Sequence, residues 1–192
     1  MVGAIGRLFL AADLSAETRR ALVAKLAGWR DRMPGRVVPP PNWHLTLRFL
    51  GDVAELDFDK LVHRMSNSDL GTAFSITFGA FGAFPRAERA TVLWLGMKRG
   101  EEQLNQLAHR VEEAVDNAGF PAEDRPFRAH LTLSRIRPPQ DVSRILARVD
   151  GVEVKHRVDS VTLFRSHLGT GGATYERLEH FPLQGVRPKA KG

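Results

Sequence analysis

Two short segments of the chain carry the same four residues and could bring acid–base chemistry to one site. His44-Leu45-Thr46-Leu47 recurs as His130-Leu131-Thr132-Leu133, 86 residues further along the chain. Alternate side chains of a β-strand point to opposite faces, so in each copy the imidazole and the hydroxyl share one face. The sequence therefore predicts two strands, each of which presents one histidine and one threonine on a common surface.

Two imidazoles and two hydroxyls that converge in one cleft would suit phosphoryl or acyl chemistry. The unperturbed pKa of histidine is about 6.5, so at neutral pH one ring can remove a proton while a protonated partner donates one. The hydroxyls of Thr46 and Thr132 can donate hydrogen bonds to the non-bridging oxygens of a phosphate held between the rings. We therefore interpret His44 and His130 as a general acid–base pair that needs no metal.

Each motif is a weak signal when it stands alone. A single histidine on a strand is more often structural than catalytic, and threonine is a good strand former. Repetition of the whole tetrapeptide changes this balance, because packing explains the repeated leucines but gives no reason for the repeated polar pair. The chain has no cysteine, and no carboxylates and histidines show metal-ligand spacing. We expect neither a metal nor another cofactor.

The segments around the two motifs repeat as well, and they must position the histidines. In each half the pattern predicts the order strand, helix, strand, helix, strand. The segments are 8–11, 15–35, 44–47, 56–65 and 75–78 in the first half, and 93–96, 101–118, 130–133, 142–149 and 160–163 in the second. A hairpin with arms 160–166 and 174–181 follows. The fold class we predict is α+β, with two similar lobes related by a pseudo-twofold axis.

Length and composition favour one folded domain. The chain has 192 residues, 43% of them hydrophobic, and 28 Lys and Arg against 22 Asp and Glu, for a net charge of +6. We expect a single domain over 1–183, with two intertwined lobes built from repeat halves at about 5–85 and 90–165. The C-terminal hairpin would extend to 183, and 184–192 would form a basic tail.

Charge and hydropathy restrict the location and the partners. No apolar run approaches the roughly 20 residues that cross a membrane, and the start of the chain shows no signal-peptide pattern. We therefore expect a cytoplasmic protein with no membrane partner. The basic balance points to an anionic partner, and nothing in the sequence demands more than a monomer.

The two motifs, in a duplicated chain of 192 residues, resemble those of the two-histidine (2H) phosphoesterase superfamily. Within it, the chain is similar to the RNA 2′,3′-cyclic phosphodiesterases, formerly called 2′-5′ RNA ligases. The resemblance runs from about residue 7 to residue 183. It rests on segments 7–11, 44–51, 128–135, 166–168, 171–175 and 181–183.

The resemblance implies a bilobal α+β fold, with an antiparallel sheet and flanking helices in each lobe and a cleft between the lobes. It also implies metal-independent hydrolysis of a terminal 2′,3′-cyclic phosphate of RNA to a 2′-phosphomonoester. In that family the first histidine protonates the leaving 3′-oxygen and the second activates water. By this resemblance His44 is the proton donor and His130 the proton acceptor, directions that strand alternation alone leaves open.

Four further residues are candidates for substrate contacts. Arg48 continues the face of His44 and Thr46, where it could meet a phosphate or remain a solvated rim charge. Arg135 follows the second motif, with Ser134 placed on the histidine face. Phe9 and Tyr175 could stack on an unpaired base, although aromatic side chains more often belong to the core.

Several alternatives stay open at this stage. The same acid–base pair could run 2′-5′ ligation or 2′-5′ phosphodiester cleavage of RNA, because the motif does not distinguish transfer to a hydroxyl from transfer to water. Small cyclic nucleotides could also be substrates. An RNA-binding module without turnover is supported only by the positive charge, and a zinc hydrolase lacks a third ligand.

Overall fold

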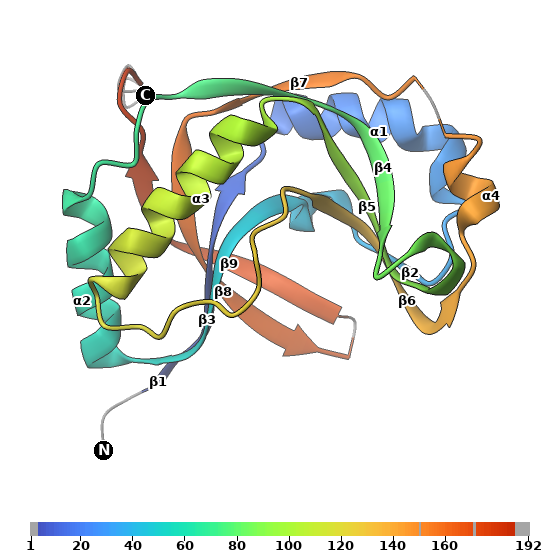
Figure 1. The fold of residues 1–192 in the computed structure, drawn as a ribbon. Helices are drawn as coiled ribbons and strands as arrows, with labels where there is room; N and C mark the ends of the chain where they lie inside the picture. The colour runs from blue at the N-terminus through green and yellow to red at the C-terminus, as the bar shows by residue number, and fades with distance from the viewer. Residues whose placement is uncertain (1–3, 150, 171, 187–192) are drawn as a thin grey trace.

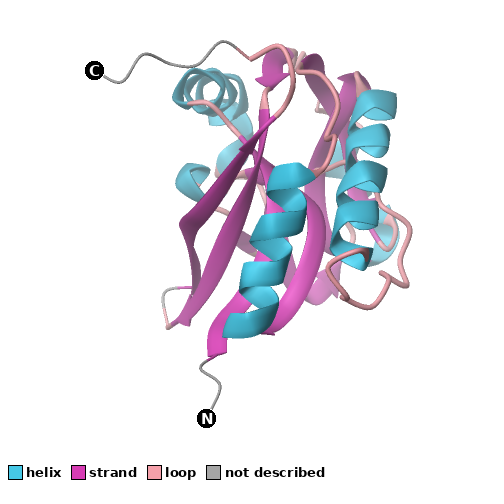
Figure 2. Ribbon diagram, turned by 90° about the vertical axis from the view of Figure 1, so that its left-hand side faces the viewer, coloured by secondary structure: helices cyan, strands magenta, loops and turns pink. Residues whose placement is uncertain are grey.

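The computed structural model describes residues 4–149, 151–170 and 172–186. Within these ranges the chain forms two antiparallel β-sheets and four α-helices (Figures 1 and 2). The predicted α+β class is confirmed. None of the described helices is long and apolar enough to cross a membrane. The end of the predicted basic tail, from residue 187 onward, lies outside the described residues.

The predicted elements occur in the expected order, and the structure adds two short strands, over 36–37 and 154–158, that the pattern does not predict. The strands are β1 (Ala4–Asp13), β2 (Arg36–Val37), β3 (His44–Ala54), β4 (Phe74–Phe84), β5 (Ala90–Arg99), β6 (Leu131–Gln140), β7 (Val154–Val158), β8 (Ser160–Gly169) and β9 (Gly172–Pro182). The helices are α1 (Ala16–Arg30), α2 (Glu55–Asn67), α3 (Glu101–Asp116) and α4 (Ser143–Leu146). The helix predicted over 142–149 is therefore shorter than expected, and the helix predicted over 15–35 ends at Arg30; the other two lie within two residues of their predicted bounds.

Each sheet takes strands from both halves of the repeat. One sheet has the order β3-β1-β8-β9, and the other has the order β2-β6-β5-β4-β7. The strand of the first motif, β3, pairs with β1, and the strand of the second motif, β6, pairs with β5. The last strand of each half, β4 or β8, lies in the sheet that holds the other half's motif. The two halves have thus exchanged strands.

The helices follow the same exchange. Helix α1 leaves β1 of the four-stranded sheet but contacts β7 of the five-stranded one, while α3 leaves β5 and contacts β3 (Figure 1). Ser15 caps α1 by accepting a hydrogen bond from the Thr18 amide at 3.1 Å, as its sequence position predicts. Leu22 and Leu26 of α1 are fully buried, each contributing about 1.5–3 kcal/mol through burial. Helices therefore cover one face of each sheet.

Candidate active site

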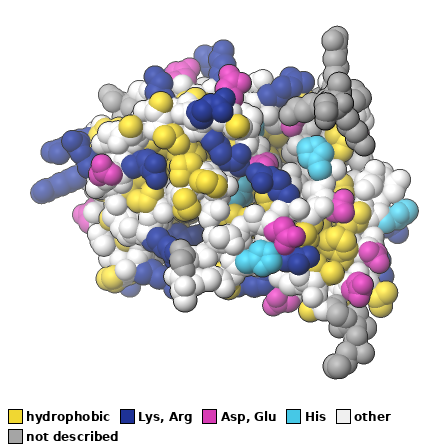
Figure 3. Space-filling model, turned by 180° about the vertical axis from the view of Figure 1, so that it is seen from behind, with side chains coloured by type: hydrophobic (Ala, Val, Ile, Leu, Met, Phe, Trp, Pro, Cys, Tyr) yellow, Lys and Arg dark blue, Asp and Glu magenta, His cyan; other side chains and the backbone are white. Residues whose placement is uncertain are grey.

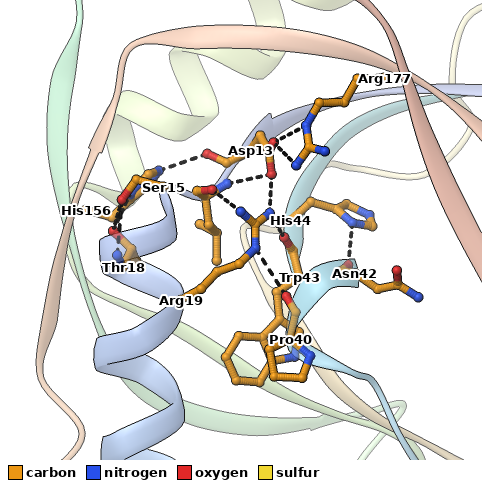
Figure 4. A network of polar contacts seen from close by, with 11 residues as sticks. Asp13, Ser15, Thr18, Arg19, Pro40, Asn42, Trp43, His44, His156 and Arg177 are labelled. Carbon is orange, nitrogen blue, oxygen red and sulfur yellow. Dashed lines mark hydrogen bonds and ion pairs between the residues drawn. The ribbon is translucent and has the colours of Figure 1, made fainter.

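The two motif histidines are held in the same way. His44 is the first residue of β3, and its Nδ1 donates to the carbonyl of Asn42 at 2.8 Å (Figure 4). His130 immediately precedes β6, and its Nδ1 donates to the carbonyl of Arg128 at 2.7 Å. In both cases the acceptor lies two residues earlier in the chain. A neutral ring held through Nδ1–H keeps the lone pair on Nε2, so Nε2 is the atom that can exchange a proton in each motif.

The fold brings the two motif strands together. Strand β3 of one sheet contacts β6 of the other, although they pair with different neighbours. The positive charge of Arg135 lies close enough to lower the pKa of both His44 and His130. One guanidinium thus acts on the two rings, which indicates that they share one electrostatic environment.

Burial gives both rings a low affinity for protons. It is the largest cause that lowers the pKa of His44 to about 4, against the hydrogen bond to Asn42 and the charge of Asp13, which raise it. Burial also lowers the pKa of His130. Both rings are therefore neutral at pH 7 in the empty site, and an anion bound between them would raise both pKa values.

Aromatic side chains pack around the first motif histidine. The ring of His44 lies 4.8 Å from that of Phe9 and 5.0 Å from that of Tyr175, the latter edge-on. Phe9 and Phe164 are stacked at 5.2 Å. These contacts place the two aromatic candidates, Phe9 and Tyr175, directly beside the first histidine.

A β-bulge overturns the prediction that Arg48 continues the face of His44 and Thr46. Ala11 pairs with Thr46, and the residue before it in β1, Leu10, pairs with Arg48. Leu47 therefore has no partner in β1 and is an extra residue of β3. One extra residue inverts the alternation beyond it. Arg48 consequently points to the face that packs on the helices, where it is only 7% exposed.

Buried Arg48 lies between two carboxylates. Its Nε is 2.6 Å from Oε2 of Glu112 on α3, and its Nη1 is 3.3 Å from Oε2 of Glu123. The guanidinium also donates to the carbonyl of Pro121. Arg48 therefore ties the strand of the first histidine to α3 and to the loop that leads to the second, and both of its terminal nitrogens donate to protein groups.

The second motif carries a bulge at the equivalent position. Trp94 pairs with Thr132, but Leu93 pairs with Ser134, so Leu133 is the extra residue. Ser134 is fully buried and donates its hydroxyl hydrogen bond to the carbonyl of Pro34. The prediction that Ser134 lies on the histidine face is wrong for the same reason as for Arg48, and Arg135 takes that face instead.

The two bulges make Arg135 and Phe49 equivalent. Each is the fifth residue after its motif histidine, and each follows the residue that the bulge turns inward. Phe49 lies beside Phe9 at 6.0 Å and is 57% exposed, whereas Arg135 is exposed and carries the charge that both histidines sense. The pseudo-symmetric site therefore has an aromatic ring on one side and a guanidinium on the other.

Removal of the Arg48 guanidinium should cost stability. We expect Arg48→Met to lower the free energy of unfolding by about 2–4 kcal/mol, because two partly buried carboxylates and the carbonyls of Phe49 and Pro121 lose their shared donor. Urea denaturation followed by circular dichroism measures this change. Arg125→Met in the exposed stretch of the same loop is the matched control, with an expected change within about 0.5 kcal/mol. Equal stability of the two variants would contradict the role given to Arg48.

A polar network that sequence reasoning missed fixes the backbone before His44 (Figure 4). The carboxylate of Asp13, the cross-strand partner of His44, accepts hydrogen bonds from Arg19 and from Nε of Arg177 at 2.8 Å. Arg19 also donates to the carbonyl of Trp43 at 3.0 Å. Trp43 and Arg177 are distant in the chain from Asp13 and Arg19, and no local pattern connects them.

His156 lies behind this network. Its Nε2 is 3.1 Å from the carbonyl oxygen of Asp13, and its Nδ1 is 3.0 Å from the hydroxyl of Thr18. The ring is buried, and burial lowers its pKa. It therefore belongs to the packing between β1, α1 and β7, unlike His63 and His109, which are exposed.

Basic side chains are dispersed over the surface. On the face shown in Figure 3, Lys and Arg side chains lie among apolar and acidic ones. The described part of this face therefore has no concentrated positive charge, whereas Arg135 supplies a charge at the histidines themselves.

Comparisons with known proteins identify the family of the chain. The model of the 2′-5′ RNA ligase superfamily matches residues 13–170. Proteins named RNA 2′,3′-cyclic phosphodiesterase are similar to the chain. The Thermus thermophilus protein is 34% identical, over 97% of this chain and 96% of its own length, and the Escherichia coli K12 protein is 31% identical, over 92% and 96%.

A solved structure is similar as well. The crystal structure of E. coli LigT complexed with 3′-AMP superposes with a TM-score of 0.74 and 29% identity, covering 93% of this chain and 98% of that one. The family match spans most of the described residues and both histidine motifs. The chain therefore belongs to the 2′-5′ RNA ligase superfamily.

Proposed function

We propose that this chain hydrolyses the 2′,3′-cyclic phosphate at the end of an RNA to a 2′-phosphomonoester. The observation that carries the proposal is the matched pair of histidines, each held through Nδ1 by the carbonyl two residues earlier. The activity named for the relatives in T. thermophilus and E. coli supports the substrate class. His44 acts as the proton donor and His130 as the proton acceptor.

The reaction is a displacement at phosphorus between the two rings. Nε2 of His130 takes a proton from water, and the water oxygen forms a bond to phosphorus. The bond between phosphorus and the 3′-oxygen breaks on the opposite side, and Nε2 of His44 gives that oxygen a proton. The rings exchange protonation states in one turnover and are reset by proton exchange with solvent.

Fixed donors stabilise the charge that develops on the phosphate. The hydroxyls of Thr46 and Thr132 donate to its non-bridging oxygens, and Arg135 offsets the added negative charge. The bound phosphate also raises the pKa of His44 from its low value of about 4, because an adjacent anion favours the imidazolium. Protonation of the acid is thereby coupled to substrate binding.

The terminal nucleoside lies on the side of the leaving oxygen, because the 3′-oxygen belongs to its ribose. That side carries Phe9 and Tyr175, which contact His44. Phe9 itself is buried, with 3% of its surface exposed, so the base would stack on the half-buried ring of Tyr175, a contact worth about 1–3 kcal/mol. Such binding tolerates any base, since every base has a π-face.

The proposal extends to the setting of the enzyme. We infer that it acts as a monomer in the cytoplasm and that small cyclic nucleotides are also cleaved. The site as described draws its histidines, threonines and Arg135 from one chain, which supports action as a monomer. Gel filtration of the active protein checks the oligomeric state.

An RNA oligonucleotide that ends in a 2′,3′-cyclic phosphate tests the activity. We expect a product heavier by one water, with the phosphate on the 2′-oxygen in the phosphorus NMR spectrum, and equal rates with and without a chelator. A 3′-phosphate product, or loss of activity in the chelator, would contradict the mechanism. A new 2′-5′ linkage between two RNA ends would instead show transfer to a hydroxyl.

A further inference from the structure

One face of the four-stranded sheet carries a cluster of aromatic side chains next to His44. Leu10 of β1 belongs to the main core beneath the helices, whereas its neighbour Phe9 does not. Phe9 instead forms a second cluster with Phe164, and Tyr175 packs against it. Successive side chains of a strand point to opposite faces, so the second cluster lies on the face opposite the helices. The first histidine contacts this cluster through Phe9 and Tyr175.

Phe49 extends the cluster on the β3 side. It is the cross-strand partner of Phe9, and the two ring centroids are 6.0 Å apart. The side chain of Phe49 is 57% exposed, and it is the only exposed aromatic side chain among the described residues. Because Leu47 is an extra residue of β3, Phe49 shares the face of His44. The exposed ring therefore lies on the side of the sheet where the reaction is proposed to occur.

The backbone that carries this exposed ring is held in place from the other side of the sheet. Nη1 of Arg48 donates to the carbonyl of Phe49, and the buried guanidinium is itself paired with Glu112 and Glu123. A ring on a fixed backbone loses little conformational freedom when a flat ligand packs on it. Stacking on exposed aromatic rings is the usual way in which proteins hold unpaired bases.

The two accessible rings lie on opposite sides of Phe9. The strand order is β3-β1-β8-β9, so Phe49 on β3 and Tyr175 on β9 flank the strand that carries Phe9. A nucleoside has a matching arrangement, because the base leaves the ribose at C1′ and the 5′-oxygen, which joins the preceding nucleotide, leaves on the C4′ side. A terminal base on Tyr175 therefore directs the RNA chain across Phe9 toward Phe49.

We propose that Phe49 stacks on the base of the nucleotide that precedes the terminal one. The inference rests on the proposed function, which places the terminal ribose at His44 and its base on Tyr175. Adjacent bases of a single strand can be splayed apart and bound separately, here with the buried ring of Phe9 between them. The enzyme would thus prefer RNA ends of at least two nucleotides, with little preference for the identity of the second base.

The test compares two dinucleotides that end in the same 2′,3′-cyclic phosphate, one complete and one whose first nucleotide lacks its base. Both carry the same phosphates, so the ratio of their kcat/KM values isolates the base. We expect a ratio of about 5-fold to 100-fold in the native enzyme, the range given by one stacked base. Phe49→Leu should bring this ratio toward one, because leucine is apolar but has no π-face. Phe49→Tyr keeps the ring and should keep the ratio.

Leu56 supplies the matched control. It lies in the first turn of α2 and is 62% exposed, so Leu56→Ala removes exposed apolar surface away from the aromatic cluster and should keep the ratio. A ratio near one in the native enzyme, a native ratio in Phe49→Leu, or an equal loss in Phe49→Leu and Phe49→Tyr would overturn the second-base site. Failure of the native enzyme to cleave either dinucleotide would instead overturn the proposed function.

Discussion

Replacement of either His44 or His130 by alanine is expected to lower turnover of a cyclic-phosphate RNA end by about 10²–10⁴-fold. Each ring moves a proton that the displacement cannot do without, and the structure holds both through the same contact with the backbone. The double variant should lose little more than each single one, because the two residues act as a unit. Single-turnover assays at saturating substrate measure the chemical step.

Exposed histidines supply the control for this experiment. His63→Ala and His109→Ala change side chains on the surfaces of α2 and α3, and their turnover should stay within about 2-fold of the native rate. Circular dichroism spectra of all variants establish that the fold is retained. A folded His44→Ala or His130→Ala protein with native turnover would exclude the acid–base pair.

The second large effect is expected at Arg135. Arg135→Gln should lower kcat/KM by about 10²–10³-fold, the usual loss when a donor to a developing anion is removed. It should also move the optimum of kcat/KM to higher pH. The guanidinium lowers the pKa of both His44 and His130, so its removal lets both rings protonate at higher pH.

Arg137→Gln is the matched control, because Arg137 is exposed two residues further along the same strand. This variant should retain the native pH optimum and nearly native kcat/KM. If kcat/KM falls equally in Arg135→Gln and Arg137→Gln, general attraction of RNA by basic residues governs the rate. A local contact made by Arg135 would then be excluded.

Sequence reasoning reached the elements and the histidines because both follow from periodic patterns. Apolar spacing placed α1, α2 and α3, and the repeated tetrapeptide singled out the two motif strands. The same reasoning failed at Arg48 and Ser134, since strand alternation assumes an unbroken register. Leu47 and Leu133 are ordinary strand residues, and nothing local indicates that each is an extra residue in its strand.

Contacts between distant segments were equally out of reach. Asp13, Arg19 and Arg177 meet at His44 only because the fold brings β1, α1 and β9 together. The indole of Trp94 packs against its cross-strand partner Gly82, where a Cβ would come within 2.1 Å of the ring, a pairing that the sequence does not reveal. The sequence repeat predicts the order of the elements. It does not predict that β4 and β8, the last strands of the two halves, each join the sheet of the other half's motif, because tertiary packing decides this.

The exchange of β4 and β8 has a consequence for the history and the folding of the molecule. A cut between β4 and β5 would yield two pieces, each with an intact histidine motif. The first piece would carry β4 without either of its neighbours, and the second would carry β8 without β1, leaving unpaired strand edges prone to association. Neither piece is self-sufficient, so an ancestral single copy with this exchange would have needed a second copy of itself before it could fold.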